Sequence, residues 1–403
     1  MRRRALLALG VLAAACAAPS ALPASPATVS AKDPFKLTSN IKYMKALGKK
    51  GENLLDVYAP RKLPDHKLPV LFWIHSGGWY QGNKTDEARA KAIKFVRSGF
   101  VFVAVNYRLS PKPTNRYSFD SDRVMFPDYV KDAAKGLGWV NRNIRDYGGN
   151  PKKIVLSGHS AGGQIAALLA TDPIYILEEK LYPDQIKGVI SLDSVALDLS
   201  AEANPKNSGE VARYHRMYWN AFGTPAENRQ QNRWKAATPM DHADPSDPPF
   251  LFIASREAPW RERDAARMAR SIGRSAGFSV IRVAMSHKRI NHTFGRDSDT
   301  SRQTTVGLKF ARSVVSDDRS KPLIRGGSRF SLPSGSSEVV RFRVGSSPSS
   351  VVLRCRLDDA TPEFCSGPES YRVGRGSHVL KVTSYDYMKG RRRVAVHRFR
   401  VSG

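Results

Sequence analysis

The sequence predicts a doubly wound α/β domain with a mostly parallel sheet, followed by a small all-β sandwich domain. First, short apolar runs alternate with amphipathic helical stretches between residues 32 and 318. Second, the composition changes at residues 319–329, which read as a linker. Third, residues 330–403 hold short alternating runs separated by turn residues, with no helical period. A chain of 403 residues is also longer than one core usually needs.

Six apolar runs in the first domain have the length and continuity of strands that are buried on both faces of a parallel sheet. Helical patterns lie between them, and the clearest cover residues 86–99, 127–149 and 262–277. The strand runs are VLFWIHS (70–76), FVFVAVNYR (100–108), KIVLSGHS (153–160), KGVISLDSV (187–195), FLFIAS (250–255) and FSVIRVAM (278–285).

Residues 201–248 interrupt this alternation with a polar, aromatic-rich and irregular stretch. One interpretation is a cover over an active site. The other is a scaffold excursion with its own small core, and the sequence does not separate the two.

The formal net charge of +29 is unusual for a globular protein of ordinary apolar content. Such a charge favours contact with anionic polymers or membrane surfaces. The chain has no nucleic-acid-binding motif and no basic stripe interleaved with aromatic residues, so a nucleic-acid partner is not expected. A solvated basic surface without a partner is the alternative.

Residues 1–31 are typical of a signal peptide and leader, because three arginines at 2–4 precede an apolar run at 5–18. Cys16 follows three alanines and loosely resembles a lipoprotein processing site, which would make a lipid anchor there the only membrane attachment. Cleavage near Ala18 or Ala24 is the other route. Both predict an exported protein that is secreted, periplasmic or attached to the cell envelope as a lipoprotein.

Cys355 and Cys365 lie close together near the C-terminus. In an oxidising compartment they can form a disulfide, and two free thiols are the alternative.

A serine stands between glycines where an apolar strand run gives way to a helical stretch. Gly158, Ser160 and Gly162 form the pattern G-x-S-x-G. Small residues allow the sharp turn that exposes a serine hydroxyl at the end of a strand, so Ser160 is the expected nucleophile. The N–H of Ala161 would face the developing oxyanion, and Gly77 and Gly78 after the first strong strand would supply further donors.

Residues 32–316 resemble the alpha/beta-hydrolase carboxylesterases of the hormone-sensitive-lipase and feruloyl-esterase-like group. The resemblance rests on the segments LLDVYAP, HSGGWYQGNK, VNYRLSP, FPDYVKDAAKGLGWVNRNIRDYGGNPKKIVLSGHSAGG and PPFLFI, in that order. It implies a Ser, acid, His order along the chain. Ser76 departs from the glycine usual in this family, directly before the two glycines assigned to the oxyanion hole.

The resemblance places the acid after the strand at 250–255, where Glu257 is the first carboxylate. Glu262 and Asp264 are rivals that also suit the start of the next helix. The histidine should follow the last strand, and His287 is favoured over His292 because it precedes Ile-Asn and then Phe-Gly as in the family.

These residues predict a serine carboxylesterase acting on small-molecule esters through a Ser160–His287–Glu257 triad and an acyl-enzyme. No metal or cofactor is expected, since the sequence has neither H-E-x-x-H nor a cysteine–histidine cluster. An arylformamidase or amidase-like activity on the same triad is one alternative. The other is an inactive hydrolase-fold binding protein anchored by its basic tail.

The tail, residues 330–403, resembles small bacterial immunoglobulin- or fibronectin-like modules in the segments CRLDDATPEFCSGPESY and GRGSHVLKVTSYDYMKGRR. Its many basic residues suggest docking on an anionic cell-wall polymer or polysaccharide, and a solvated strand surface is the alternative.

Overall fold

A computed structural model gives the fold of most of the chain. It describes residues 30, 32–113, 119–273, 280–316, 323–327, 329–331, 338–345, 351–365, 367–386 and 391–402. The expected signal segment with Cys16 lies outside the described residues, except for Ser30, and so does part of the expected linker. Among the helices of the described ranges, none combines the length and apolar character needed to cross a membrane.

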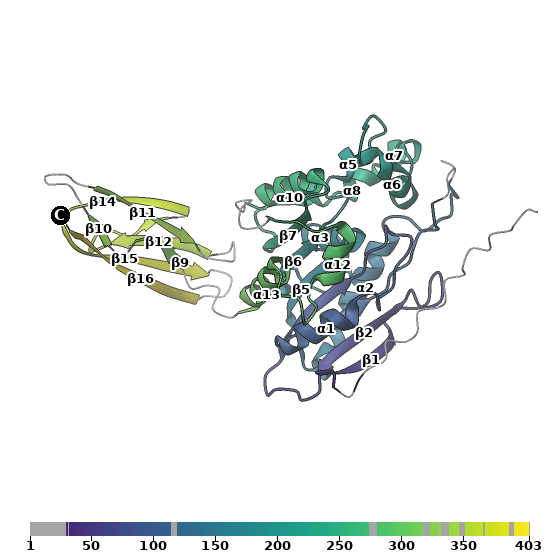
Figure 1. The fold of residues 1–403 in the computed structure, drawn as a ribbon, viewed down its shortest axis with the longest axis horizontal. Helices are drawn as coiled ribbons and strands as arrows, with labels where there is room; N and C mark the ends of the chain where they lie inside the picture. Colours follow the sequence, from purple (N-terminus) through teal and green to yellow (C-terminus); the bar gives the residue numbers. More distant parts are fainter. Residues whose placement is uncertain are drawn as a thin grey trace, which may run out of the picture.

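An eight-stranded sheet with the order β1-β2-β4-β3-β5-β6-β7-β8 forms the first domain (Figure 1). The strands from β4 to β8 run parallel, whereas β1 and β2 are antiparallel and extend one edge. The predicted doubly wound, mostly parallel sheet is therefore confirmed. The strands are β1 (Phe35–Lys42), β2 (Leu54–Pro60), β3 (Leu68–Ile74), β4 (Val101–Val105), β5 (Gly149–His159), β6 (Ile186–Leu192), β7 (Phe250–Ser255) and β8 (Val280–Val283).

Helices cover both faces of this sheet, and two separate cores result. One face packs on α2 (Asp128–Asn143), α3 (Ala161–Thr171) and α10 (Pro259–Ser271). The other packs on α1 (Ala88–Arg97), α12 (His287–Thr293) and α13 (Arg302–Val315). Side chains of a strand alternate between the cores, as Phe72 and Trp73 of β3 do, which explains why the strand runs read as continuously apolar.

The stretch expected to be irregular is helical. It includes α6 (His215–Phe222), whose Tyr218 and Phe222 are fully buried and pack against the Trp79 ring. This stretch therefore shares the core of the first domain rather than forming one of its own. Its elements are α5 (Leu199–Glu202), a 3₁₀ turn (Val211–Tyr214), α6, α7 (Pro225–Gln231), α8 (Arg233–Ala236) and α9 (Pro239–His242), and the remaining short elements are 3₁₀ turns at Ile144–Tyr147 and Pro183–Gln185 and helix α4 (Ile174–Glu178).

A buried carboxyl group joins this helical stretch to the turn after β6. Glu202, the last residue of α5, accepts hydrogen bonds from the N–H groups of Ala196 and Asp198 and from the Tyr218 hydroxyl. Burial raises the pKa of Glu202 to about 8, and the nearby charge of Asp264 acts in the same direction. Glu202 is therefore protonated at neutral pH in the folded protein.

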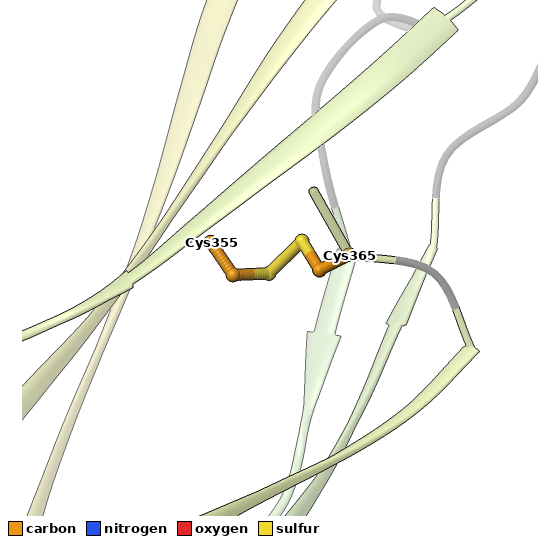
Figure 2. Close-up of a disulfide and its surroundings, with 2 residues drawn as sticks. All are labelled: Cys355 and Cys365. Atoms are coloured by element: carbon orange, nitrogen blue, oxygen red, sulfur yellow. A yellow bond between two sulfur atoms is a disulfide. The ribbon is translucent and has the colours of Figure 1, made fainter. Parts of the chain in front are cut away.

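The second domain is a β-sandwich of a five-stranded sheet, β10-β16-β15-β12-β13, and a three-stranded sheet, β14-β11-β9. Its core includes Val340, Phe342, Leu380 and Phe399. The Cys355 and Cys365 side chains are joined by a disulfide (Figure 2). The strands are β9 (Leu323–Arg325), β10 (Arg329–Ser331), β11 (Glu338–Gly345), β12 (Val351–Leu357), β13 (Glu363–Phe364), β14 (Gly367–Val373), β15 (Gly376–Asp386) and β16 (Arg391–Ser402).

We expect Glu202→Gln to change how stability depends on pH. The raised pKa means that the unfolded chain ionises at this position from about pH 4.5 upward, while the folded chain stays protonated until about pH 8. The stabilising contribution is thus complete below pH 4.5 and is lost as the pH rises to 8. Urea unfolding followed by tryptophan fluorescence should show a wild-type slope more negative by up to about 1.4 kcal/mol per pH unit than that of the variant. Parallel slopes would contradict the assignment.

Removal of the disulfide should weaken the sandwich alone. The bridge closes a loop with a sequence separation of 10, for which chain entropy gives about 3 kcal/mol. In Cys355→Ser/Cys365→Ser, amide hydrogen exchange in β12 and β15 should accelerate accordingly. All six tryptophans lie in the first domain, so the unfolding midpoint by tryptophan fluorescence serves as the internal control and should not move. Unchanged exchange in β15 would contradict this prediction.

Candidate active site

Ser160 stands at the sharp turn between β5 and α3. Its backbone has φ 54° and ψ −118°, a region that a residue with a side chain rarely adopts. A strained residue of this kind costs about 1–3 kcal/mol and is held only where the surroundings impose it. The glycine pair permits it here, because a Cβ on Gly158 would lie 2.3 Å from the carbonyl oxygen of Gly162 and would prevent the close approach of the turn. The G-x-S-x-G pattern therefore forms the sharp turn between strand and helix that the sequence predicts, with Ser160 at its tip lining the cavity although most of its surface is covered.

Ser160 lines a cavity of about 1120 Å³ together with Gly77, Gly78 and His287. Gly77 and Gly78 both have positive φ, at 120° and 59°. A side chain on Gly78 would collide with Met217 and Tyr80. Within the described ranges, the N–H groups of Gly77, Gly78 and Ala161 donate to no protein acceptor. Three donors are thus available for an oxygen bound near the serine.

His287, the first residue of α12, contacts a carboxylate that the sequence analysis did not assign. Its Nδ1 lies 2.6 Å from Oδ2 of Asp193, the residue directly after β6. Asp193 is fully buried at its side chain, whereas the His287 ring is 31% exposed toward the cavity. An imidazole held at Nδ1 by a carboxylate presents Nε2 to accept a proton.

The Asp193 carboxylate has two further partners. Its Oδ1 accepts a hydrogen bond of 2.8 Å from the Ser255 N–H at the end of β7, and its Oδ2 lies 2.7 Å from Nη1 of Arg261 on α10. Burial raises the pKa of Asp193, but the hydrogen bond to His287 and the charge of Arg261 outweigh it and hold that pKa below its usual value. Asp193 is therefore a carboxylate at neutral pH.

Arg261 links the Asp193 carboxylate to the helical stretch at residues 199–242. Its side chain is buried, and Nη2 donates to the Tyr214 hydroxyl at 2.8 Å. Its guanidinium also lies 5.0 Å from the Trp260 ring centre. Tyr214 itself lines the cavity, so the insertion both packs into the core and contributes to the site.

His159 links the serine turn to α12. It is buried, and its Nε2 lies 2.9 Å from the backbone oxygen of His287. Burial holds the pKa of His159 well below its usual value, and the neighbouring His287 acts in the same direction. A neutral His159 that donates to this carbonyl fixes the start of α12 next to Ser160. His75 is also buried and neutral, with its pKa lowered to about 4 by burial, and it stacks on Tyr107.

The structure corrects the expected acid. Glu257 is exposed, and its carboxylate has no hydrogen bond or ion pair to any described residue. Its backbone N–H is instead bound by Ser255 Oγ. The turn after β7 therefore points the Glu257 side chain into solvent. The imidazole is contacted instead by Asp193, from the neighbouring turn after β6.

The other candidates also lie away from the His287 imidazole. Glu262 pairs with Arg282 at 3.0 Å, and Asp264 lies 3.6 Å from Arg267 one turn along α10. His292 lies at the cavity rim, where Nδ1 is 2.9 Å from Glu87.

Of the two residues that the sequence analysis missed, only Asp193 could have been sought from the sequence, by one signal. Asp193 follows an apolar strand run directly, at the carboxyl end where parallel α/β sheets place their functional groups. Arg261 carries no comparable signal.

The arrangement places a serine hydroxyl, an imidazole oriented by a carboxylate and backbone N–H groups with no acceptor among the described residues around one cavity, which are the groups that acyl transfer by a serine needs. Between Ser160 and the imidazole, no hydrogen bond is formed in the described part of the chain, and such contacts often tighten only when substrate binds. The same ranges contain no group of three or more histidine, cysteine or acidic residues with the geometry of a metal site.

Comparisons with known proteins agree with this geometry. Esterase LipQ of Mycobacterium tuberculosis is 28% identical over 58% of this chain and 52% of its own length. The probable carboxylic ester hydrolase LipM of the same organism is 37% identical over 30% of this chain and 26% of its own length. The chain thus spans about half or less of these two relatives.

Solved structures share the fold. A truncated carbohydrate esterase from gut microbiota superposes with a TM-score of 0.52 at 15% identity, over 71% of this chain and 98% of its own. The metagenomic carboxylesterase EstE1 superposes with a TM-score of 0.51 at 20% identity, over 71% and 91%. The first domain therefore has the alpha/beta-hydrolase fold. The BD-FAE family model matches residues 55–260, a segment that includes β2 to β7 and Ser160, and the chain belongs to the BD-FAE family.

Proposed function

We propose that this protein is a serine carboxylesterase whose triad is Ser160, His287 and Asp193. The observation that carries the proposal is the 2.6 Å contact between His287 and the buried Asp193, in a cavity that the strained Ser160 also lines. The esterase names of the relatives support the reaction class. We further propose that residues 1–31 direct export, because their pattern of arginines and apolar residues is that of a signal segment.

The mechanism follows from the positions of these groups. Ser160 Oγ attacks the ester carbonyl carbon while its proton passes to His287 Nε2. The N–H groups of Gly77, Gly78 and Ala161 stabilise the oxyanion, and the removal of one such donor typically costs about 3–4 kcal/mol. The intermediate then expels the alcohol, which takes the proton from His287. Water, deprotonated by His287, releases the acid and restores the serine.

Asp193 keeps His287 in the tautomer with its Nδ1 protonated and stabilises the imidazolium that forms. Arg261 and the Ser255 N–H hold the carboxylate in place, so it does not swing toward solvent. The same groups can act on amides or formamides, because acyl transfer alone does not fix the leaving group. We propose esters because the relatives LipQ and LipM are described as an esterase and a probable carboxylic ester hydrolase.

A second proposal concerns the sandwich, whose five-stranded sheet has a basic outer face. Strand pairing places Arg356 opposite Lys381, and Arg354 lies with its guanidinium 4.7 Å from the ring centre of Phe364. On β16, Arg398 and Arg400 share this face by register with β15. We call these five cations, Arg354, Arg356, Lys381, Arg398 and Arg400, the basic sheet face.

Nothing in the described ranges neutralises the basic sheet face, since none of the five cations has a carboxylate partner there. A row of cations beside the exposed Val394, Val396 and Phe364 suits an extended polyanion whose rings also offer C–H faces to apolar side chains. We therefore propose that the sandwich binds an anionic polysaccharide of the cell envelope.

The triad proposal predicts different outcomes for the two carboxylates. Asp193→Asn should lower kcat/KM for 4-nitrophenyl butyrate by on the order of 10³–10⁴-fold, because the imidazole loses its orienting carboxylate. Glu257→Gln should stay within about twofold of wild type, because its exposed carboxylate has no hydrogen bond or ion pair to any described residue. Initial rates measured at 400 nm give both values.

Ser160→Ala serves as the background, and circular dichroism confirms that each variant is folded. A large loss in Glu257→Gln with a small one in Asp193→Asn would overturn the assignment of the acid. Absence of turnover by wild type on esters, together with turnover of formamides or amides, would move the protein to the other hydrolase class.

The basic sheet face predicts salt-sensitive binding of polygalacturonate. Changing Arg354, Lys381, Arg398 and Arg400 to glutamine should weaken binding at 50 mM salt by about tenfold or more, measured by co-sedimentation or calorimetry. The matched control changes Arg341, Arg372, Arg375 and Lys62 to glutamine, with the same loss of net charge. Equal loss in both variants would show that net charge alone drives binding and would refute a defined face. Neutral dextran should bind to none of them.

A further inference from the structure

The active-site cavity has an uneven distribution of charge. Lys288, Arg289, His292 and Arg296 line it from α12 and the turn that follows, together with the acidic residues Glu87 and Asp299. The apolar and aromatic lining comes from other elements, in Val195, Tyr214 and Met217. The cavity therefore has charged lining beside His287, and its apolar and aromatic lining comes from other parts of the chain.

Both acidic residues are already engaged. Glu87 pairs with Arg296 at 2.8 Å and with His292 at 2.9 Å. Burial raises the pKa of Glu87, but the hydrogen bonds to His292 and Arg296 outweigh it, and the pKa lies below its usual value. Asp299 accepts hydrogen bonds from the Ser301 N–H and hydroxyl and from the Thr304 hydroxyl.

Lys288 and Arg289 are left without such partners. Both side chains are exposed, and neither has an ion pair with any described residue. They follow His287 directly in the chain. The helix that carries them, α12, is anchored to α1 by hydrogen bonds. The buried Lys91 donates to the carbonyl oxygens of Asn291 and Phe294, which anchors the end of α12. Two free cations are thus presented on a fixed helix at the mouth of the site.

We propose that Lys288 and Arg289 are specificity-determining residues that recognise an anionic group on the ester substrate. The proposal rests on the proposed esterase function and names its substrate class: esters that carry a carboxylate or a similar oxyanion. A carboxylate that approaches Lys288 and Arg289 is attracted by both charges at once, and neither cation has to give up an ion pair with another described residue. The anion sits on either the acyl or the alcohol part, and the experiment below separates these two arms.

Two matched substrate pairs test the proposal. For the acyl arm, the pair is mono-4-nitrophenyl adipate and 4-nitrophenyl hexanoate. For the alcohol arm, the pair is 4-acetoxybenzoate and its methyl ester. The ratio of kcat/KM between the anionic and the neutral ester is measured for wild type and for Lys288→Met/Arg289→Met. The neutral ester normalises for any disturbance of the catalytic centre.

We expect this ratio to fall about tenfold in the double variant for at least one pair, and the wild-type ratio to fall as salt rises from 50 to 500 mM. The swap Lys288→Arg/Arg289→Lys keeps both charges and should keep the ratio. The control Lys62→Met/Lys152→Met loses the same net charge outside the cavity and should also keep it.

Unchanged ratios in the double variant for both pairs would overturn the anion proposal while leaving the esterase intact. An equal fall in the Lys62/Lys152 control would also overturn it, because net charge would then be the cause. Failure of the esterase proposal is distinct, since the neutral esters would then show no turnover that depends on Ser160.

Discussion

The site depends on one buried carboxylate, that of Asp193, and on the groups that converge on it. The turn after β6 brings Asp193 into contact with the end of β7, with α10 through Arg261 and with α12 through His287. A buried guanidinium without a partner costs about 3–5 kcal/mol, so the removal of this carboxylate affects packing as well as chemistry. One side chain thus fixes the relative positions of four segments, and the imidazole gains its orientation as a consequence.

The nucleophile was predictable because its geometry is local. The residues that force the turn at Ser160 lie within five positions, and the collision that a side chain on Gly158 would meet involves Gly162 itself. The sheet was predictable for a related reason, since strands that serve two cores must be apolar on both faces. Strands β1 and β2 lacked this signal. Half of the edge strand β1 is exposed, in an irregular pattern, and β2 carries the charged Asp56 among its buried residues. The histidine was found by its position after the last strand.

The carboxylate that contacts His287 was not predictable by the same reasoning. Strands β6 and β7 are parallel neighbours, so the turns that follow them end side by side and either can reach the same imidazole. Both Asp193 and Glu257 satisfy the order of serine, acid and histidine. The choice is made by contacts distant in sequence, above all by Arg261 and by the Ser255 N–H. The helical stretch at 199–242 was missed because its helices are only four to eight residues long, too short for a clear period.

The cations of the chain include two kinds: buried arginines that are paired with carboxylates, and cations on two surfaces that have no ion pair with any described residue. In the first domain the most buried arginines are committed to carboxylates, Arg261 to Asp193 and Arg123 to Glu227. Those that remain unpaired at the cavity mouth and on the basic sheet face act over about one Debye length, roughly 10 Å at 0.1 M salt. Under the two proposals, each surface would select anions by itself. On a polymer that carries its own ester groups, binding by the sandwich would raise the local concentration of ester near Ser160. Such tethering lowers KM without changing kcat, because it adds no interaction in the transition state that is absent from the bound substrate.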